Sequence, residues 1–210
     1  MISVDAALGH LFALAQPVEV EEVPLTAAAG RTLAREMSAT RDQPPFPSSA
    51  MDGYAVRGAE VRTGAVFDVV GTSAAGHGSD ISLGPGQALR IFTGAPVPNG
   101  AYRIVIQEDV TRAGDQITID EAPDAGPYVR PAGGDFKAGD TVTAPRVLGP
   151  ADLSLLAAMN HAVVPCRRRP DVAILATGDE LVMPGETPRA DQIIASNGVG
   201  LKALIEAAGG

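Results

Sequence analysis

The chain has 210 residues, 45% hydrophobic and 20% charged, the balance of a globular protein with one large or two modest domains. A net charge of −9 argues against binding to nucleic acid or to an anionic membrane surface, and the lack of tryptophan argues against a base-stacking platform for single-stranded nucleic acid. The single cysteine, Cys166, excludes an internal disulfide and favours a reducing compartment. The N-terminus lacks a basic signal region, and no stretch approaches the roughly 20 apolar residues of a membrane span, so we expect a cytoplasmic protein.

The first 40 residues predict a helix followed by a small strand layer. Ser3 can cap a helix that continues to about Leu14, with leucines and Phe12 on its apolar side. The segment from Val18 to Leu25 alternates like a strand, and a short helical turn and a second strand follow it.

From Arg41 to about Asp140 the sequence predicts a compact β-rich domain, either a barrel or a sandwich. Prolines at 44, 45 and 47 exclude a helix at its start. Short β-like runs separated by glycine follow: "YAVRG", "VFDVVGTS", "QALRIFTG", "RIVIQEDVTR" and "QITID". The connection "RAGDQ" between the last two runs predicts a hairpin turn.

After Val147 the sequence predicts alternating helices and strands. Pro150 marks the start of a helix, and Asn160 lies past its end. The run from Asp171 to Ala176 is typical of a buried parallel strand. A loop and a helix capped by Ser196 or Asn197 follow, and this order is the beginning of an α/β unit.

Four loops place an acid or a hydroxyl beside glycine. They are "SAMDGYA" with Asp52, "FTGAPVP" with Thr93, "AGGDF" with Asp135, and "TGDEL" with Asp179 and Glu180. Glycine lets a ligand approach the backbone closely, and these oxygen groups suit Mg²⁺. Any one such loop is more often a plain turn, but four of them in one acidic chain indicate a site.

Other candidate sites are weaker. His10, His77 and His161 are far apart and share no metal-ligand spacing, so a zinc enzyme is not expected. The loop "GTSAAGHGS" lacks a phosphate-binding lysine and is more typical of a flexible loop. Cys166 fits a packing residue, and the Arg167 to Arg169 run fits a solvated linker, with phosphate docking left open.

Together these segments resemble the molybdopterin molybdenumtransferases, the MoeA family, which includes the E domain of gephyrin. The resemblance rests on "DQPPFPSSAMDGYAV", "RIFTGAPVPNGA", "VIQED", "VRPAGGDFKAGD" and "LGPADLSLLAAMNHAVVPCRRRPDVAILATGDEL", in this order and spacing. It covers essentially all 210 residues. Members of the family continue well beyond the position of Gly210, so the resemblance implies an N-terminal portion.

The resemblance implies a role in molybdenum cofactor biosynthesis. Molybdate would be inserted into adenylylated molybdopterin, with Mg²⁺ present and AMP released. The catalytic positions it implies are Asp52, Thr93, Asp135 and Glu180. Of these, the implied metal ligands are Asp52, Asp135 and Glu180. The implied cofactor-binding positions are Gly53, Gly94, Gly178 and Asp179. The alternative is a non-catalytic fragment or binding module of the same family.

The resemblance also implies an architecture: an elongated, mixed α/β, multidomain homodimer. Residues 1–40 and 141–168 would form a small α+β domain, with the barrel-like β-rich domain, 41–140, inserted into it. Residues 169–210 would begin an α/β domain of the molybdopterin-binding kind. Asp52, Thr93 and Asp135 would then face the partner's Glu180 in a shared site, and a second protein would donate the adenylylated molybdopterin.

Overall fold

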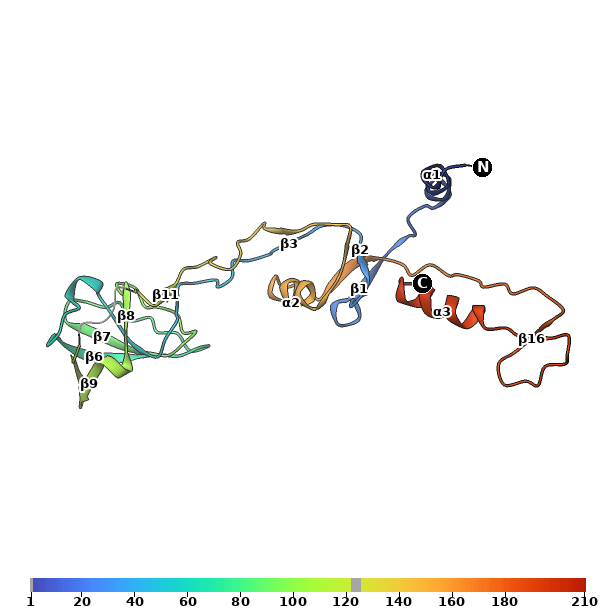
Figure 1. Ribbon diagram of the computed structural model, residues 1–210. Helices are drawn as coiled ribbons and strands as arrows, with labels where there is room; N and C mark the ends of the chain where they lie inside the picture. Colours follow the sequence, from blue (N-terminus) through green and yellow to red (C-terminus); the bar gives the residue numbers. More distant parts are fainter. Residues whose placement is uncertain (1, 122–125) are drawn as a thin grey trace. The chain divides into compact units, whose positions relative to one another are not determined.

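The computed structural model describes residues 2–121 and 126–210, and the chain folds into two compact units, one that combines helices with strands and one that is β-rich (Figure 1). One unit combines Met1–Met37 with Thr141–Gly210, and the other is Ser38–Asp140. The β-rich unit is therefore inserted between two stretches of the first unit. Residues 169–210, expected as a separate domain, are grouped with the N-terminal stretch.

The first unit contains a four-stranded sheet, β1-β14-β2-β13, and the helix α2. The elements of this sheet and its neighbouring segments are β1 (Val20–Pro24), the 3₁₀ turn η1 (Leu25–Ala27), β2 (Thr32–Leu33), β13 (Arg146–Val147), α2 (Pro150–Ala158) and β14 (Val163–Arg167). β1 pairs antiparallel with β14 across five residue pairs. Leu33, Leu156, Val164 and Cys166 are completely buried, so Cys166 is a packing residue as the sequence predicted.

Helix boundaries in this unit follow the sequence signals. α1 (Val4–Leu14) begins after Ser3, whose Oγ accepts a hydrogen bond from the Ala6 backbone N–H. α2 starts at Pro150, and Asn160 beyond its end has a φ of +71°. Both helix predictions are confirmed, because capping depends on local residues that the sequence displays directly.

The C-terminal stretch departs from the sequence prediction. Residues 171–176 form no strand and all are exposed. β15 (Leu181–Val182) and β16 (Ile193–Ile194) form a two-residue parallel ladder, and α3 (Asn197–Ala207) follows. The predicted buried strand is wrong because a parallel strand needs neighbours and covered faces, which no described segment supplies to residues 171–176.

The inserted unit is built on a six-stranded sheet with the order β8-β5-β7-β6-β10-β9. Its strands are β5 (Gly53–Val56), β6 (Val66–Ser73), β7 (Gln87–Ile91), β8 (Arg103–Ile106), β9 (Val110–Ala113) and β10 (Gln116–Ile119). β6 and β7 run parallel, and all other neighbours are antiparallel. The predicted run "RIVIQEDVTR" is interrupted by the 3₁₀ turn η3 (Gln107–Asp109), which separates β8 from β9.

Both faces of this sheet are covered by apolar side chains. One cluster includes Phe67, Val56, Val105 and Ile117, and the other includes Leu89, Ile91 and Ile104. All four residues of the central strand β5 are buried. This two-sided core holds the ends of β5, β7 and β8 in fixed register.

Shorter elements complete the structure. They are β3 (Met37–Ser38) with β12 (Thr141–Val142), β4 (Ser48–Ser49) with β11 (Val129–Arg130), and η2 (Gly58–Glu60). The proline stretch before β4 is not helical, as predicted. Across the described residues, no helix combines the length and apolar character needed to cross a bilayer.

Candidate active site

The candidate site lies where the strand ends of the six-stranded sheet meet, at the ends of β6, β7 and β8 and the start of β5. We call this side of the sheet the Asp52 edge. Gly53, the first residue of β5, is opposite Ile91 at the end of β7 and Ile106 at the end of β8. β6 also ends at this edge, because Ser73 is opposite Ile91. The topology therefore brings Asp52, Thr93 and Gln107, each just outside a strand, to the same place.

Asp52 and Thr93 are in direct contact. Oδ1 of Asp52 accepts hydrogen bonds from both the backbone N–H and the Oγ1 hydroxyl of Thr93, each at 2.8 Å. These two bonds hold one carboxylate oxygen in place from residues that are 41 positions apart in sequence. The second oxygen, Oδ2, has no hydrogen-bond partner within the described residues, so it can accept a ligand.

The glycines beside these residues have distinct roles. A Cβ on Gly53 would overlap the Val105 carbonyl oxygen, so glycine is required for β8 to approach β5. Gly94 has a φ of +81°, and its N–H donates to the Ser49 carbonyl at 2.9 Å. Both glycines therefore position the site through the backbone.

The carboxyl group of Asp52 is held in its charged form. Its pKa is lowered mainly by the hydrogen bond from the Thr93 backbone N–H and next by the Thr93 hydroxyl. The positive charge of Arg90 adds to this lowering, and partial desolvation opposes it. A charged carboxylate with a free oxygen suits a hard divalent cation or a donor group of a substrate.

Arg90 and Gln107 join this arrangement, although the sequence did not single them out. Arg90 Nη1 donates to the Gly53 carbonyl at 3.1 Å, and Nη2 donates to Gln107 Oε1 at 2.5 Å. The Gln107 backbone N–H donates to the Asp52 carbonyl at 3.1 Å. The available signal was a charged residue between two buried apolar residues of β7, Leu89 and Ile91.

Asp135 belongs to the same unit as Asp52, in an exposed loop. Its backbone N–H donates to the Gln43 carbonyl at 2.9 Å, and the nearby Gly133 N–H donates to the Pro44 carbonyl at 2.8 Å. The loop is thus fastened to the proline stretch. No hydrogen bond or ion pair joins Asp135 to Asp52 or Thr93 among the described residues.

Gly178, Asp179 and Glu180 belong to the other unit, in the turn before β15. Gly178 has a φ of +149°, and its carbonyl accepts from the Leu181 N–H at 3.2 Å. The Glu180 carbonyl accepts from the Ile193 N–H at 2.8 Å. Glu180 also lines a pocket of about 580 Å³, together with Thr177 and residues at the start of α3.

The residues that the structure describes contain no cluster of three or more His, Cys, Asp or Glu side chains close enough to hold a metal ion. A Mg²⁺ ion often binds proteins through only one or two carboxylates and takes its other ligands from water and phosphate. Asp52 alone can therefore contribute to such a site without a preformed cage.

Comparisons with known proteins agree in their result. Residues 2–160 match the model of the MoeA N-terminal region, domains I and II. The chain is 39% identical over 194 residues to the molybdopterin molybdenumtransferase of Nostoc sp., covering 90% of this chain and 44% of that protein. It is 36% identical over 209 residues to the molybdopterin molybdenumtransferase of Haemophilus influenzae, covering 98% and 52%.

A solved structure supports the same relation. A crystal structure of a molybdopterin biosynthesis MoeA protein from Pyrococcus horikoshii has a TM-score of 0.85 and 32% sequence identity. The match covers all of this chain and 55% of that one. The chain therefore spans about half the length of the curated relatives and of the solved structure that it matches.

Proposed function

The chain belongs to the MoeA family, and from that premise we propose that it acts in molybdenum cofactor biosynthesis as the N-terminal part of a molybdopterin molybdenumtransferase. The reaction would insert molybdate into adenylylated molybdopterin with release of AMP. The observation that carries this proposal is the Asp52 carboxylate, which Thr93 holds by one oxygen while no described residue hydrogen-bonds to the other.

Both proposed substrates are anions, whereas the chain has a net charge of −9. The donor set at Asp52 fits Mg²⁺, because the carboxylate is charged, has one oxygen with no hydrogen-bond partner among the described residues, and is positioned by two hydrogen bonds to the other. When bound, Mg²⁺ would neutralise and polarise phosphoryl oxygens. Asp52 would hold the ion together with Asp135 and Glu180, and Thr93 would fix the orientation of Asp52.

The remaining proposed roles concern loops and partners. Gly94 would let the cofactor approach the Asp52 edge, Gly53 would serve the cofactor site indirectly by letting β8 lie against β5, and Gly178 and Asp179 would bind the cofactor beside Glu180. Asp52 and Glu180 lie in different units. As the resemblance to the family implies, we propose a homodimer in which Asp52 of one copy works with the partner's Glu180. A separate donor protein would supply adenylylated molybdopterin in the cytoplasm, without nucleic acid or membrane.

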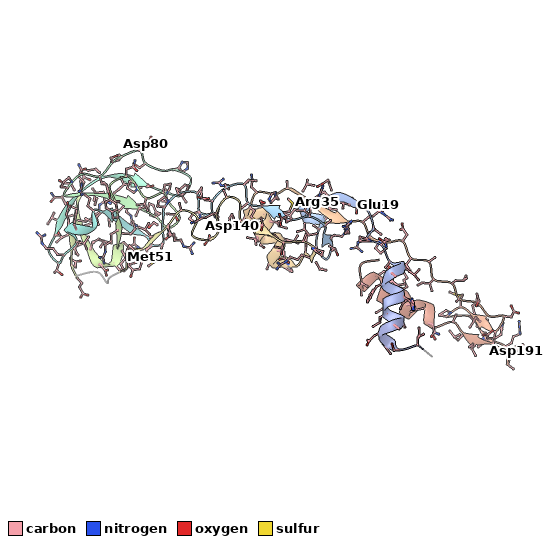
Figure 2. All side chains as sticks on the ribbon, turned by 90° about the horizontal axis from the view of Figure 1, so that it is seen from above. Glu19, Arg35, Met51, Asp80, Asp140 and Asp191 are labelled. Atoms are coloured by element: carbon pink, nitrogen blue, oxygen red, sulfur yellow. The ribbon has the colours of Figure 1, made fainter. Side chains whose placement is uncertain are left out.

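The test measures AMP release and bound molybdenum. Purified chain is mixed with adenylylated molybdopterin, molybdate and Mg²⁺, and Asp52→Asn is compared with Asp80→Asn. Asp80 is an exposed aspartate on the opposite side of the unit from Met51, the neighbour of Asp52 (Figure 2). The proposal expects Asp52→Asn to lose most turnover and Asp80→Asn to keep it. Equal turnover in both variants would contradict it.

The alternative function is a non-catalytic binding module of the same family. A binding module would retain Mg²⁺-dependent binding of adenylylated molybdopterin, sensitive to Asp52→Asn, with no AMP release. Isothermal titration with the same two variants separates this outcome from catalysis.

The shared site has its own test. Asp52→Asn and Glu180→Gln chains, each inactive alone, are unfolded, mixed and refolded. Random pairing in a dimer gives heterodimers with one intact site, so about one quarter of wild-type activity should return. No recovery in the mixed sample would place both residues in the same copy's site.

A further inference from the structure

The guanidinium group of Arg90 contacts three segments at the Asp52 edge of the sheet: the start of β5 at Gly53, the turn after β8 at Gln107, and Phe92 beside Thr93. We propose that Arg90 is a positioning residue, which holds the Asp52–Gly53 backbone and the Thr93 turn in a single arrangement. The inference rests on the proposed function for the importance of Asp52, but its geometry is independent of the reaction.

The hydrogen bonds around Arg90 form a closed ring. Nη1 binds the Gly53 carbonyl, and Nη2 binds the side chain of Gln107. Gln107 in turn donates its backbone N–H to the Asp52 carbonyl. Two successive carbonyls, those of Asp52 and Gly53, are therefore held by one pair of residues, which restricts the peptide that carries the carboxylate.

Arg90 also contacts the segment that carries Thr93. Its guanidinium carbon lies 4.7 Å from the centre of the Phe92 ring and 5.1 Å from the centre of the Tyr54 ring. Both distances fit cation–π contacts. Phe92 is the residue before Thr93, and Tyr54 is two residues after Asp52, so the same group restrains both partners of the Asp52–Thr93 hydrogen bonds.

The strand register explains why this position takes arginine. Arg90 on β7 lies directly opposite Tyr54 on β5, and both β7 and β8 flank β5. A planar guanidinium can donate in two directions while its face rests on aromatic rings. A lysine ammonium supplies the charge but lacks this fork, so charge alone should not replace Arg90.

The test follows the two amides that donate to Asp52, those of Thr93 and Gln107, by hydrogen exchange in the full chain. In Arg90→Gln we expect both amides to exchange faster by about tenfold, while the Ile119 amide of β10 stays near its wild-type rate. Arg90→Lys should behave almost like Arg90→Gln. Arg62→Gln, at an exposed arginine of the same unit, is the matched control and should change nothing.

A milder variant covers the case in which Arg90→Gln does not fold. Gln107→Ala changes an exposed side chain and opens the ring of hydrogen bonds, so the Thr93 amide should still exchange faster. Unchanged exchange at Thr93 would overturn the inference. Equal acceleration at Ile119 would also overturn it, because Arg90 would then support the whole unit.

Kinetics separate this inference from the proposed function. If the wild-type chain releases AMP, Arg90→Lys should lower kcat by about tenfold with little change in KM, as expected when a catalytic group is misplaced. If the wild-type chain releases none, the proposed catalysis fails for this chain, and the exchange rates alone still decide the role of Arg90.

Discussion

The β-rich unit and the C-terminal stretch, residues 171–210, differ in how completely their apolar side chains are buried. In the β-rich unit, Leu89, Ile91 and Ile104 are completely buried in one core cluster of the six-stranded sheet. In residues 171–210, Leu175 is 87% exposed and Leu204 is 67% exposed. Apolar residues are no rarer in residues 171–210, where they are 19 of 40, than in residues 38–140, where they are 40 of 103, so composition does not determine burial.

The difference lies in partners for the backbone. β5 has neighbours on both sides and core on both faces, whereas residues 171–176 pair with no described strand. An extended apolar segment is stabilised when its hydrogen bonds and both faces are satisfied together. The β-rich unit supplies these partners within 103 residues of contiguous chain, Ser38–Asp140.

The largest expected effect tests the difference in burial between the two regions directly. Ile104→Ala should lower the free energy of unfolding of the β-rich unit by about 2–5 kcal/mol, because it leaves a cavity in a fully packed core. Ile193→Ala, the same change at a side chain that is 59% exposed, should stay within about 0.5 kcal/mol.

Chemical denaturation measures both variants. All three tyrosines, Tyr54, Tyr102 and Tyr128, lie in the β-rich unit and the chain has no tryptophan, so intrinsic fluorescence follows that unit alone. Circular dichroism follows the whole chain. Equal losses in the two variants would mean that the regions do not differ in packing.

A second prediction tests how closely β5 and β8 pack at the candidate site. Gly53→Ala should destabilise the β-rich unit by about 1–3 kcal/mol, because the new methyl group meets the Val105 carbonyl and must push β8 away. Gly58→Ala, where a Cβ meets only ordinary contacts, should change stability by less than about 0.5 kcal/mol.

Tyrosine fluorescence in a denaturant series measures this pair of glycine variants too. Matching midpoints for the two would show that β5 and β8 can separate without cost. The close approach of the strands would then not explain the glycine.

The smallest expected effect concerns the charge of Asp52. In Thr93→Val the pKa of Asp52 should rise part of the way to its ordinary value, because the hydroxyl is lost while the backbone N–H remains. Thr93→Ser keeps a hydroxyl and should leave the pKa low. Carbon-13 NMR titration of the carboxyl groups measures both.

The sign of the stability change follows from linkage. A lowered pKa in the folded state contributes stability above the ordinary pKa of the carboxyl group, and this contribution is lost as the pH falls through the folded value. Wild type and Thr93→Val should therefore differ most above the ordinary pKa and converge in stronger acid. A difference that grows with acid would contradict this account of Asp52.

Much of the fold was predictable because its signals are local. Ser3 and Pro150 marked helix starts, Gly114 marked the hairpin turn, and "VFDVVGTS" matches β6 residue for residue. The sequence also identified Asp52 and Thr93 as candidates, each in a glycine loop. It missed Arg90 and Gln107, because a charged residue in one strand says nothing of which carbonyls lie across the sheet.

By itself, the sequence determined the helix caps, the turns, the β-rich character of residues 41–140 and the membership of the MoeA family. Only the tertiary structure decided that Asp52, Thr93, Arg90 and Gln107 meet, because strand order and register bring together segments up to 55 residues apart, from Asp52 to Gln107. It also decided that residues 171–176 form no strand. Caps and turns depend on a few neighbouring residues, whereas strands and sites depend on partners supplied from elsewhere in the chain.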